Sequence, residues 1–108
     1  MVNLKQLGQL ALGTSASIIY TVPASTNTII KEMAICNTSS SAVSVNVYMV
    51  PSGGTAGAAN AVISGYSIAA NLPAFFTGLN TIIPAGATIQ GSASASGVTI
   101  TISGAEVS

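Results

Sequence analysis

The stretch Val43–Val50, which reads VSVNVYMV, gives the clearest indication of the fold. Its apolar residues occupy every second position and are Val43, Val45, Val47 and Met49. The positions between them hold Ser44, Asn46 and Tyr48. Because successive side chains of a strand point to opposite faces, this pattern predicts a β-strand with one face in the core. The other face is expected to contact solvent or another protein.

Strand patterns continue on both sides of this stretch. Val98, Ile100 and Ile102 alternate with threonine and serine in the same way. Weaker strand patterns cover residues 17–22, 61–68, 75–83 with a break near Gly78, and 87–93. The four prolines fall between these stretches, at positions 23, 51, 73 and 84, where they are expected to end strands. We therefore predict an all-β protein, a single small antiparallel β-sandwich of jelly-roll-like form with about eight strands.

Residues 28–37 predict a further strand with an unusual charge pattern. Strict alternation places Ile29, Met33 and Ile35 on one face, and Ile30, Ala34 and Cys36 on the other. The adjacent Lys31 and Glu32 then place one charge on each face, and such a strand is expected to lie partly at a sheet edge. Cys36 is expected to be a small core residue.

The chain has 108 residues, which is enough for one hydrophobic core and too few for two. We divide it into residues 1–13, expected to be an N-terminal arm or a first strand, and residues 14–108, expected to form the β-sandwich domain. The glycine-rich run Ser52–Gly57 lacks the spacing of a phosphate-binding loop and is expected to be a loop between strands.

The near absence of charge excludes several classes of function. The only Lys, Arg, Asp or Glu residues are Lys5, Lys31, Glu32 and Glu106, and there is no histidine. Catalytic triads and zinc or calcium sites lack their usual residues, and two carboxylates alone are weak support for a glycosidase. We expect no enzyme activity, catalytic residue, metal or cofactor. Nucleic-acid binding and membrane spanning are not expected either.

The same composition favours association with other proteins. An uncharged surface lacks the repulsion that keeps small domains apart. Large aromatic side chains are the usual anchors of interfaces, and those proposed here are Tyr48, Tyr66, Phe75 and Phe76. The adjacent phenylalanines are expected to project to opposite faces of their sheet. For each aromatic residue, packing in the core is the alternative.

Several segments resemble the small β-sandwich virion proteins of tailed bacteriophages and prophages. They are YTVPA at 20–24, IKEMAICNT at 30–38, VPSGGTA at 50–56, FTGLN at 76–80 and PAGATIQ at 84–90. The resemblance extends over residues 17–103 and consists of turn and strand signatures. It implies a structural role and assigns no residue a chemical one.

We therefore expect a structural virion protein, foremost a capsid decoration or cement protein that stabilises the phage head through contacts between subunits. The expected partners are the major capsid protein or other virion proteins, together with further copies of the chain in a homo-oligomer, with a trimer favoured. The location would be the virion, assembled in the bacterial cytoplasm. One alternative is a neck, tail or fibre-attachment component. Another is a carbohydrate-binding host-recognition module that uses Tyr48, Tyr66 and the asparagine-rich turns.

Overall fold

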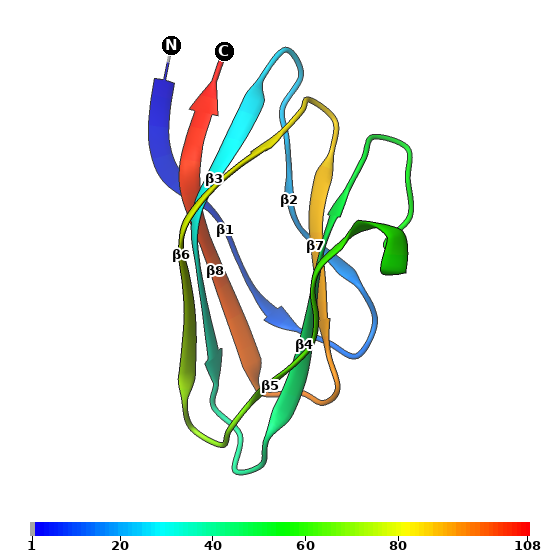
Figure 1. Ribbon diagram of the computed structural model, residues 1–108, viewed down its shortest axis with the longest axis vertical. Coiled ribbons are helices and arrows are strands. Elements are labelled where there is room, and N and C mark those ends of the chain that lie inside the picture. The colour runs from blue at the N-terminus through cyan, green and yellow to red at the C-terminus, as the bar shows by residue number, and fades with distance from the viewer. Residues whose placement is uncertain (1) are drawn as a thin grey trace.

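The structure is a computed structural model that describes residues 2–108 and consists of two four-stranded antiparallel sheets (Figure 1). Sheet A has the strand order β1-β8-β3-β6, and sheet B has the order β2-β7-β4-β5. The strands are β1 (Val2–Leu12), β2 (Ser17–Thr21), β3 (Asn27–Asn37), β4 (Val43–Val50), β5 (Ala61–Ile68), β6 (Pro73–Ile83), β7 (Thr88–Ala93) and β8 (Val98–Val107). One short 3-10 helix, Ala58–Asn60, precedes β5.

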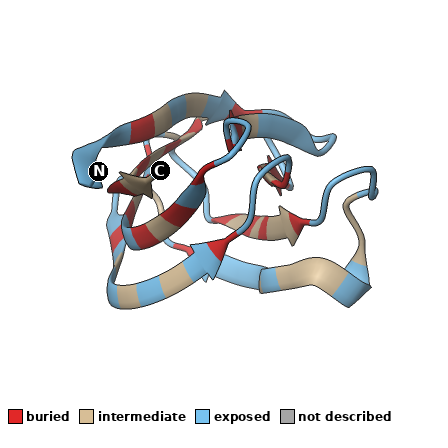
Figure 2. Ribbon diagram, turned by 90° about the horizontal axis from the view of Figure 1, so that it is seen from above, coloured by how far each residue is buried: buried red, intermediate tan, exposed pale blue. Residues whose placement is uncertain are grey.

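The strand pairing confirms the predicted jelly roll. β1 pairs with β8, β2 with β7, β3 with β6 and β4 with β5, so the pairs are nested like those of one long hairpin. Two further pairings, β3 with β8 and β4 with β7, join these hairpin arms into two sheets. Seen from above, the sheets form two layers in which buried and exposed residues alternate along the strands (Figure 2). This is the eight-stranded double-sheet arrangement of a jelly roll.

The core lies between the two sheets and comes from the predicted alternating strands. Val45 and Val47 of β4 and Ile100 and Ile102 of β8 are all fully buried. Residues 2–12 of the expected arm or first strand form β1, which pairs with β8 along its length and contributes Leu7 and Leu12 to the core. Met1 lies outside the described residues.

The expectation that residues 28–37 form a partly edge strand is wrong, because β3 lies between β8 and β6. The expected faces are wrong as well. The register shifts between Ile30 and Glu32, so Lys31 is an extra residue that opposes no partner on β8. Two successive residues, Lys31 and Glu32, are exposed, while Ile30 and Met33 on either side are buried. Both charges therefore lie on the outer face, and the bulge reverses the alternation beyond them.

The reversed alternation also changes the position of the cysteine. After the bulge, Met33 and Ile35 point into the core, and Ala34 and Cys36 occupy the outer positions. Cys36 is an exposed free thiol, and its expected place in the core is wrong.

Other strands of sheet A are irregular at the same level. β1 carries one extra residue, Leu7, and β6 inserts residues 78–80 opposite Lys31. Strand β8 has no extra residue here but carries Gly104, where an added Cβ would overlap the carbonyl oxygen of Ile29 and lie 3.2 Å from Leu7 Cδ1. The main chain of β3 therefore approaches β8 so closely that only glycine fits. We call this level, from Leu7 through Gly104 and Lys31 to residues 78–80, the bulge line.

A buried asparagine fixes the lower end of the sandwich. The side-chain amide of Asn37 donates hydrogen bonds to the carbonyl oxygens of Ser41 and Ile68, at 2.9 Å each. Its oxygen accepts hydrogen bonds from the backbone NH and hydroxyl of Ser39, at 3.0 and 2.7 Å. Asn37 is fully buried, so it joins the turn after β3 to the end of β5 with its polar atoms satisfied.

Replacing Gly104 with alanine tests the bulge line. The added methyl group must displace the main chain of β3, so we expect Gly104→Ala to lower the free energy of unfolding by about 3 kcal/mol or more. Gly13→Ala is the matched control, since a Cβ at Gly13 meets nothing within 4 Å. Chemical denaturation followed by circular dichroism measures both changes. Equal stability of the two variants would contradict the close approach.

Candidate interaction surface

The outer face of sheet A carries an apolar row across all four strands, and the row is exposed on the two edge strands. The register places Leu4 beside Ala105, Ala105 beside Ile29, and Ile29 beside Ile82. Leu4 is 76% exposed and Ile82 is 65% exposed, whereas Ile29 is half-buried and Ala105 is buried. Because these residues share one level of the sheet, their side chains form a continuous band perpendicular to the strands.

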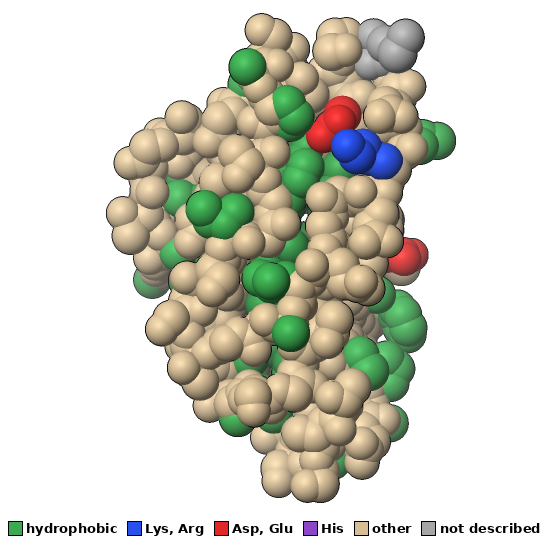
Figure 3. Space-filling view, turned by 180° about the vertical axis from the view of Figure 1, so that it is seen from behind, with side chains coloured by type: hydrophobic (Ala, Val, Ile, Leu, Met, Phe, Trp, Pro, Cys, Tyr) green, Lys and Arg blue, Asp and Glu red, His purple; other side chains and the backbone are tan. Residues whose placement is uncertain are grey.

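A second band lies on the other side of the bulge line. Here Gln9, Thr101, Ala34 and Phe75 are neighbours in the register, and Phe75 is 64% exposed. Lys31 and Glu32 lie between the two bands and are the charged residues of this face. We call the surface formed by Leu4, Ile29, Lys31, Glu32, Phe75 and Ile82 the sheet A face. Figure 3, seen from behind, shows few charged groups and several hydrophobic side chains along the right margin, the side of sheet A.

The outer face of sheet B is more polar. Asn46 donates a hydrogen bond to Ser92 Oγ at 3.4 Å and accepts one from the backbone NH of Gly65 at 2.8 Å. The backbone NH of Ser44 donates to Ser94 Oγ at 3.0 Å. Ile18, on edge strand β2, is an exposed apolar residue of this face, and its register partner is Gln90. The two outer faces therefore differ, and sheet A has the more apolar one.

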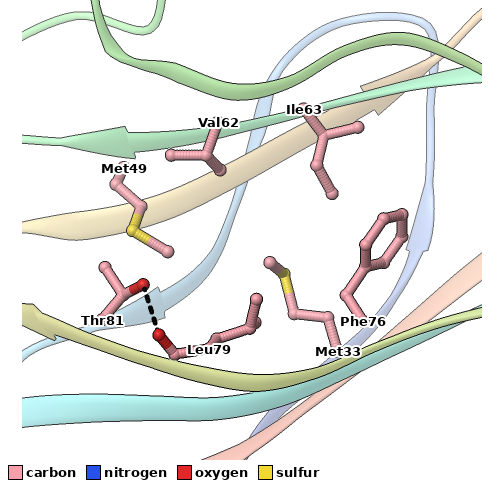
Figure 4. A pocket seen from close by; sticks show the side chains of 7 residues that line it. All are labelled: Met33, Met49, Val62, Ile63, Phe76, Leu79 and Thr81. Carbon is pink, nitrogen blue, oxygen red and sulfur yellow. Dashed lines mark hydrogen bonds between the residues drawn. The ribbon is translucent and has the colours of Figure 1, made fainter.

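A second apolar feature lies where the two sheets diverge at strands β5 and β6. A cavity of about 150 Å³ opens there, with Met33, Phe76 and Leu79 on the sheet A side. Met49, Val62 and Ile63 approach it from sheet B, as Figure 4 shows. At this opening the rings of Tyr66 and Phe76 pack edge to face, with their centroids 5.4 Å apart. This pair links β5 to β6 across the gap between the sheets.

The four aromatic residues proposed as interface anchors lie in three different parts of the structure. Phe75 lies on the sheet A face, and Phe76 points inward to the cavity, so the two project to opposite faces. Tyr66 packs on Phe76, whereas Tyr48 is half-buried on the outer face of sheet B. Tyr48 and Tyr66 therefore do not form one binding surface. Sequence reasoning missed Leu4, Ile29 and Ile82, because only the register shows that they are neighbours.

A small network of polar groups closes the end of the sandwich near the termini. The Tyr20 hydroxyl donates to Glu106 Oε2 at 2.5 Å and lies 2.8 Å from Thr28 Oγ1. Lys5 Nζ lies 3.4 Å from Glu106 Oε1 and forms an ion pair with it. The hydrogen bond from Tyr20 is the main cause that lowers the pKa of Glu106, and Lys5 adds to it. Burial, followed by the bond to Glu106, raises the pKa of Tyr20 to about 12.

In the part of the chain that the structure describes, no three His, Cys, Asp or Glu side chains gather where they could hold a metal ion. Nor does any helix within residues 2–108 have the length and apolar character needed to cross a membrane.

The fold and these surfaces define a small jelly-roll β-sandwich with one apolar outer face. No protein-family model matches the chain, and no curated protein matches it. Among solved structures, the fold is similar to that of a chain from Bacillus endospore appendages, described as a novel family of disulfide-linked pili. The TM-score is 0.58 with 14% identity, covering 100% of this chain and 88% of that one.

A chain in the structure of infectious bursal disease virus, Gx strain, is also similar. Its TM-score is 0.57 with 15% identity, covering 98% of this chain. The match spans only 31% of the viral chain. At these identities the two likenesses show a shared fold.

The Tyr20–Glu106 bond predicts a specific dependence of stability on pH. Because folding lowers the pKa of Glu106 below its ordinary value of 4.5, the stability it contributes is present above that value and is lost as the pH falls through the folded pKa. We expect Tyr20→Phe to flatten the decrease in unfolding free energy between about pH 5 and pH 3. Tyr48→Phe, which removes a hydroxyl that bonds no carboxylate, should leave that decrease unchanged. Denaturant titrations across this range measure it, and equal slopes for both variants would contradict the role of the bond.

Proposed function

We propose that this protein is a structural subunit that works by packing against other protein subunits and carries out no chemical step. The observation that carries the proposal is the sheet A face, an exposed apolar surface with only Lys31 and Glu32 as charges. Contiguous apolar surface of this kind is unfavourable in water and marks sites of protein interaction. With no net charge on the chain, little long-range repulsion opposes such contacts.

In its finer form, the proposal is a decoration or cement protein of a tailed-phage head. The support is the resemblance of residues 17–103 to small β-sandwich virion proteins, together with the jelly-roll fold. Such a protein would bind the major capsid protein or other virion proteins and would be located in the virion after assembly in the host cytoplasm. A neck, tail or fibre-attachment component would bind different virion proteins through the same surface.

The stabilising mechanism follows from the geometry of the face. A sheet face of four strands buries apolar side chains together, and any opening of the shell must expose them again. Each contact of this size is modest, but many copies on one particle act together through multivalency. The contact costs little conformational entropy, because the side chains already lie on ordered strands.

Two matched charge insertions test whether the sheet A face makes the contacts. Ile82 and Ile18 are both exposed residues of edge strands, 65% and 56% respectively, but they lie on opposite sheets. We expect Ile82→Asp to reduce self-association by about tenfold or more, because it places an unpaired charge in the buried face. Ile18→Asp should leave self-association unchanged.

Light scattering over a series of protein concentrations gives the mass of each variant, and circular dichroism verifies that both remain folded. Particles larger than a monomer that dissociate only with Ile82→Asp support the proposal. Equal effects of the two substitutions on self-association would contradict the role of the sheet A face.

A further inference from the structure

We infer that the sheet A face binds the same face of a second copy of the chain, about a twofold axis that crosses the strands at the bulge line. This inference rests on the proposed function and names the partner of the surface on which that function depends. Three observations carry it, namely the order of the two central charges, the arrangement of the apolar residues of the two bands on β3 and β6, and the extent of the face.

The charges on the face are self-complementary. Lys31 and Glu32 are adjacent on β3, and the bulge turns both side chains outward. With a twofold axis between them, β3 of one copy runs antiparallel over β3 of the other. Lys31 of each copy then faces Glu32 of the other, which gives two reciprocal pairs, as an isologous interface requires.

The two charged groups are available for these pairs. Lys31 Nζ donates to Asn80 Oδ1 at 2.7 Å, which uses one of its three donors and holds the ammonium group on the face. Among residues 2–108, the side-chain carboxylate of Glu32 has no hydrogen bond or ion pair with another residue. In the inferred dimer, the Lys31 ammonium group of the second copy pairs with this Glu32 carboxylate.

The apolar bands exchange places under the same axis. The band with Ile29 and Ile82 lies on one side of the bulge line, and the band with Ala34 and Phe75 lies on the other. The axis reverses the direction along the strands, so Ile82 of each copy lies over Phe75 of the second copy. A large aromatic ring therefore meets a β-branched side chain at both ends of the β3–β6 half of the face, where they bury each other.

The extent of the face suits a reversible pair. Four strands at about 4.8 Å spacing and about 10 residues at about 3.3 Å rise give roughly 600 Å² on each copy. The total, about 1,200 Å², is at the lower limit of specific interfaces. We therefore expect a dimer that forms and dissociates with concentration. The trimer expected from the sequence is the competing arrangement, and its heterologous contacts would not make the reciprocal Lys31–Glu32 pairs.

Exchanging the charges tests the twofold arrangement. Lys31→Glu places two glutamates opposite two glutamates, and Glu32→Lys places lysines opposite lysines, so each variant alone should dimerise about tenfold more weakly than wild type. An equimolar mixture of the two variants restores opposite charges at both contacts, and a heterodimer should form with an affinity close to that of wild type. The double variant Lys31→Glu/Glu32→Lys is the matched control, and it should dimerise like wild type.

Native mass spectrometry, with one variant isotope-labelled, counts homodimers and heterodimers directly. Sedimentation velocity gives the affinities. Both substituted residues are exposed, so circular dichroism should show unchanged folding. Restored pairing in the mixture supports the inference.

A mixture no tighter than the single variants, a trimeric mass, or a monomeric wild type would overturn the inference. If wild type associates and Ile82→Asp dissociates it while the mixture fails to pair, the proposed packing function stands and the twofold arrangement is wrong.

Discussion

The close approach of β3 to β8 at Gly104 is the constraint on which the rest of the molecule depends. Because a Cβ at Gly104 would overlap the Ile29 carbonyl, the two main chains meet there only through glycine. The extra residues Leu7, Lys31 and 78–80 lie within about one residue of this level in β1, β3 and β6. The bulge in β3 keeps apolar side chains inward on both sides of a charged pair, and it directs both charges outward. In β3, this irregularity decides which side chains enter the core and which lie on the outer face.

The sequence predicts regular strands well and the irregular strand poorly. Val43–Val50 and Ala61–Ile68 have the predicted bounds, because strict alternation or bounding turn residues mark them. Prolines also mark strand ends, and Pro73 is the first residue of edge strand β6. For residues 28–37, strict alternation gave the wrong faces beyond Lys31 and misplaced Cys36. Strict alternation does not predict a one-residue bulge, and Gly104, the register partner of Ile30 beside it, lies more than seventy residues away in the sequence.

The residues of the interaction surface could not be recognised as neighbours from the sequence pattern alone. Phe75 and Phe76 were predicted to face opposite ways, and they do. Leu4, Ile29 and Ile82 come from three strands, and each one alone is an unremarkable apolar residue. Only the pairing register makes them neighbours of Ala105 in one band. The asymmetry between an apolar sheet A face and a polar sheet B face follows, and it gives the sandwich one side suited to packing against protein.

The reactivity of Cys36 tests most directly whether the sheet A face becomes buried. This free thiol is exposed on that face, beyond the band that contains Phe75, and no substitution is needed to follow it. We expect its rate of reaction with a small thiol reagent to fall as protein concentration rises, because pairing of the faces covers it. A rate that stays constant while light scattering shows that the protein associates would contradict the claim that this face forms the contact.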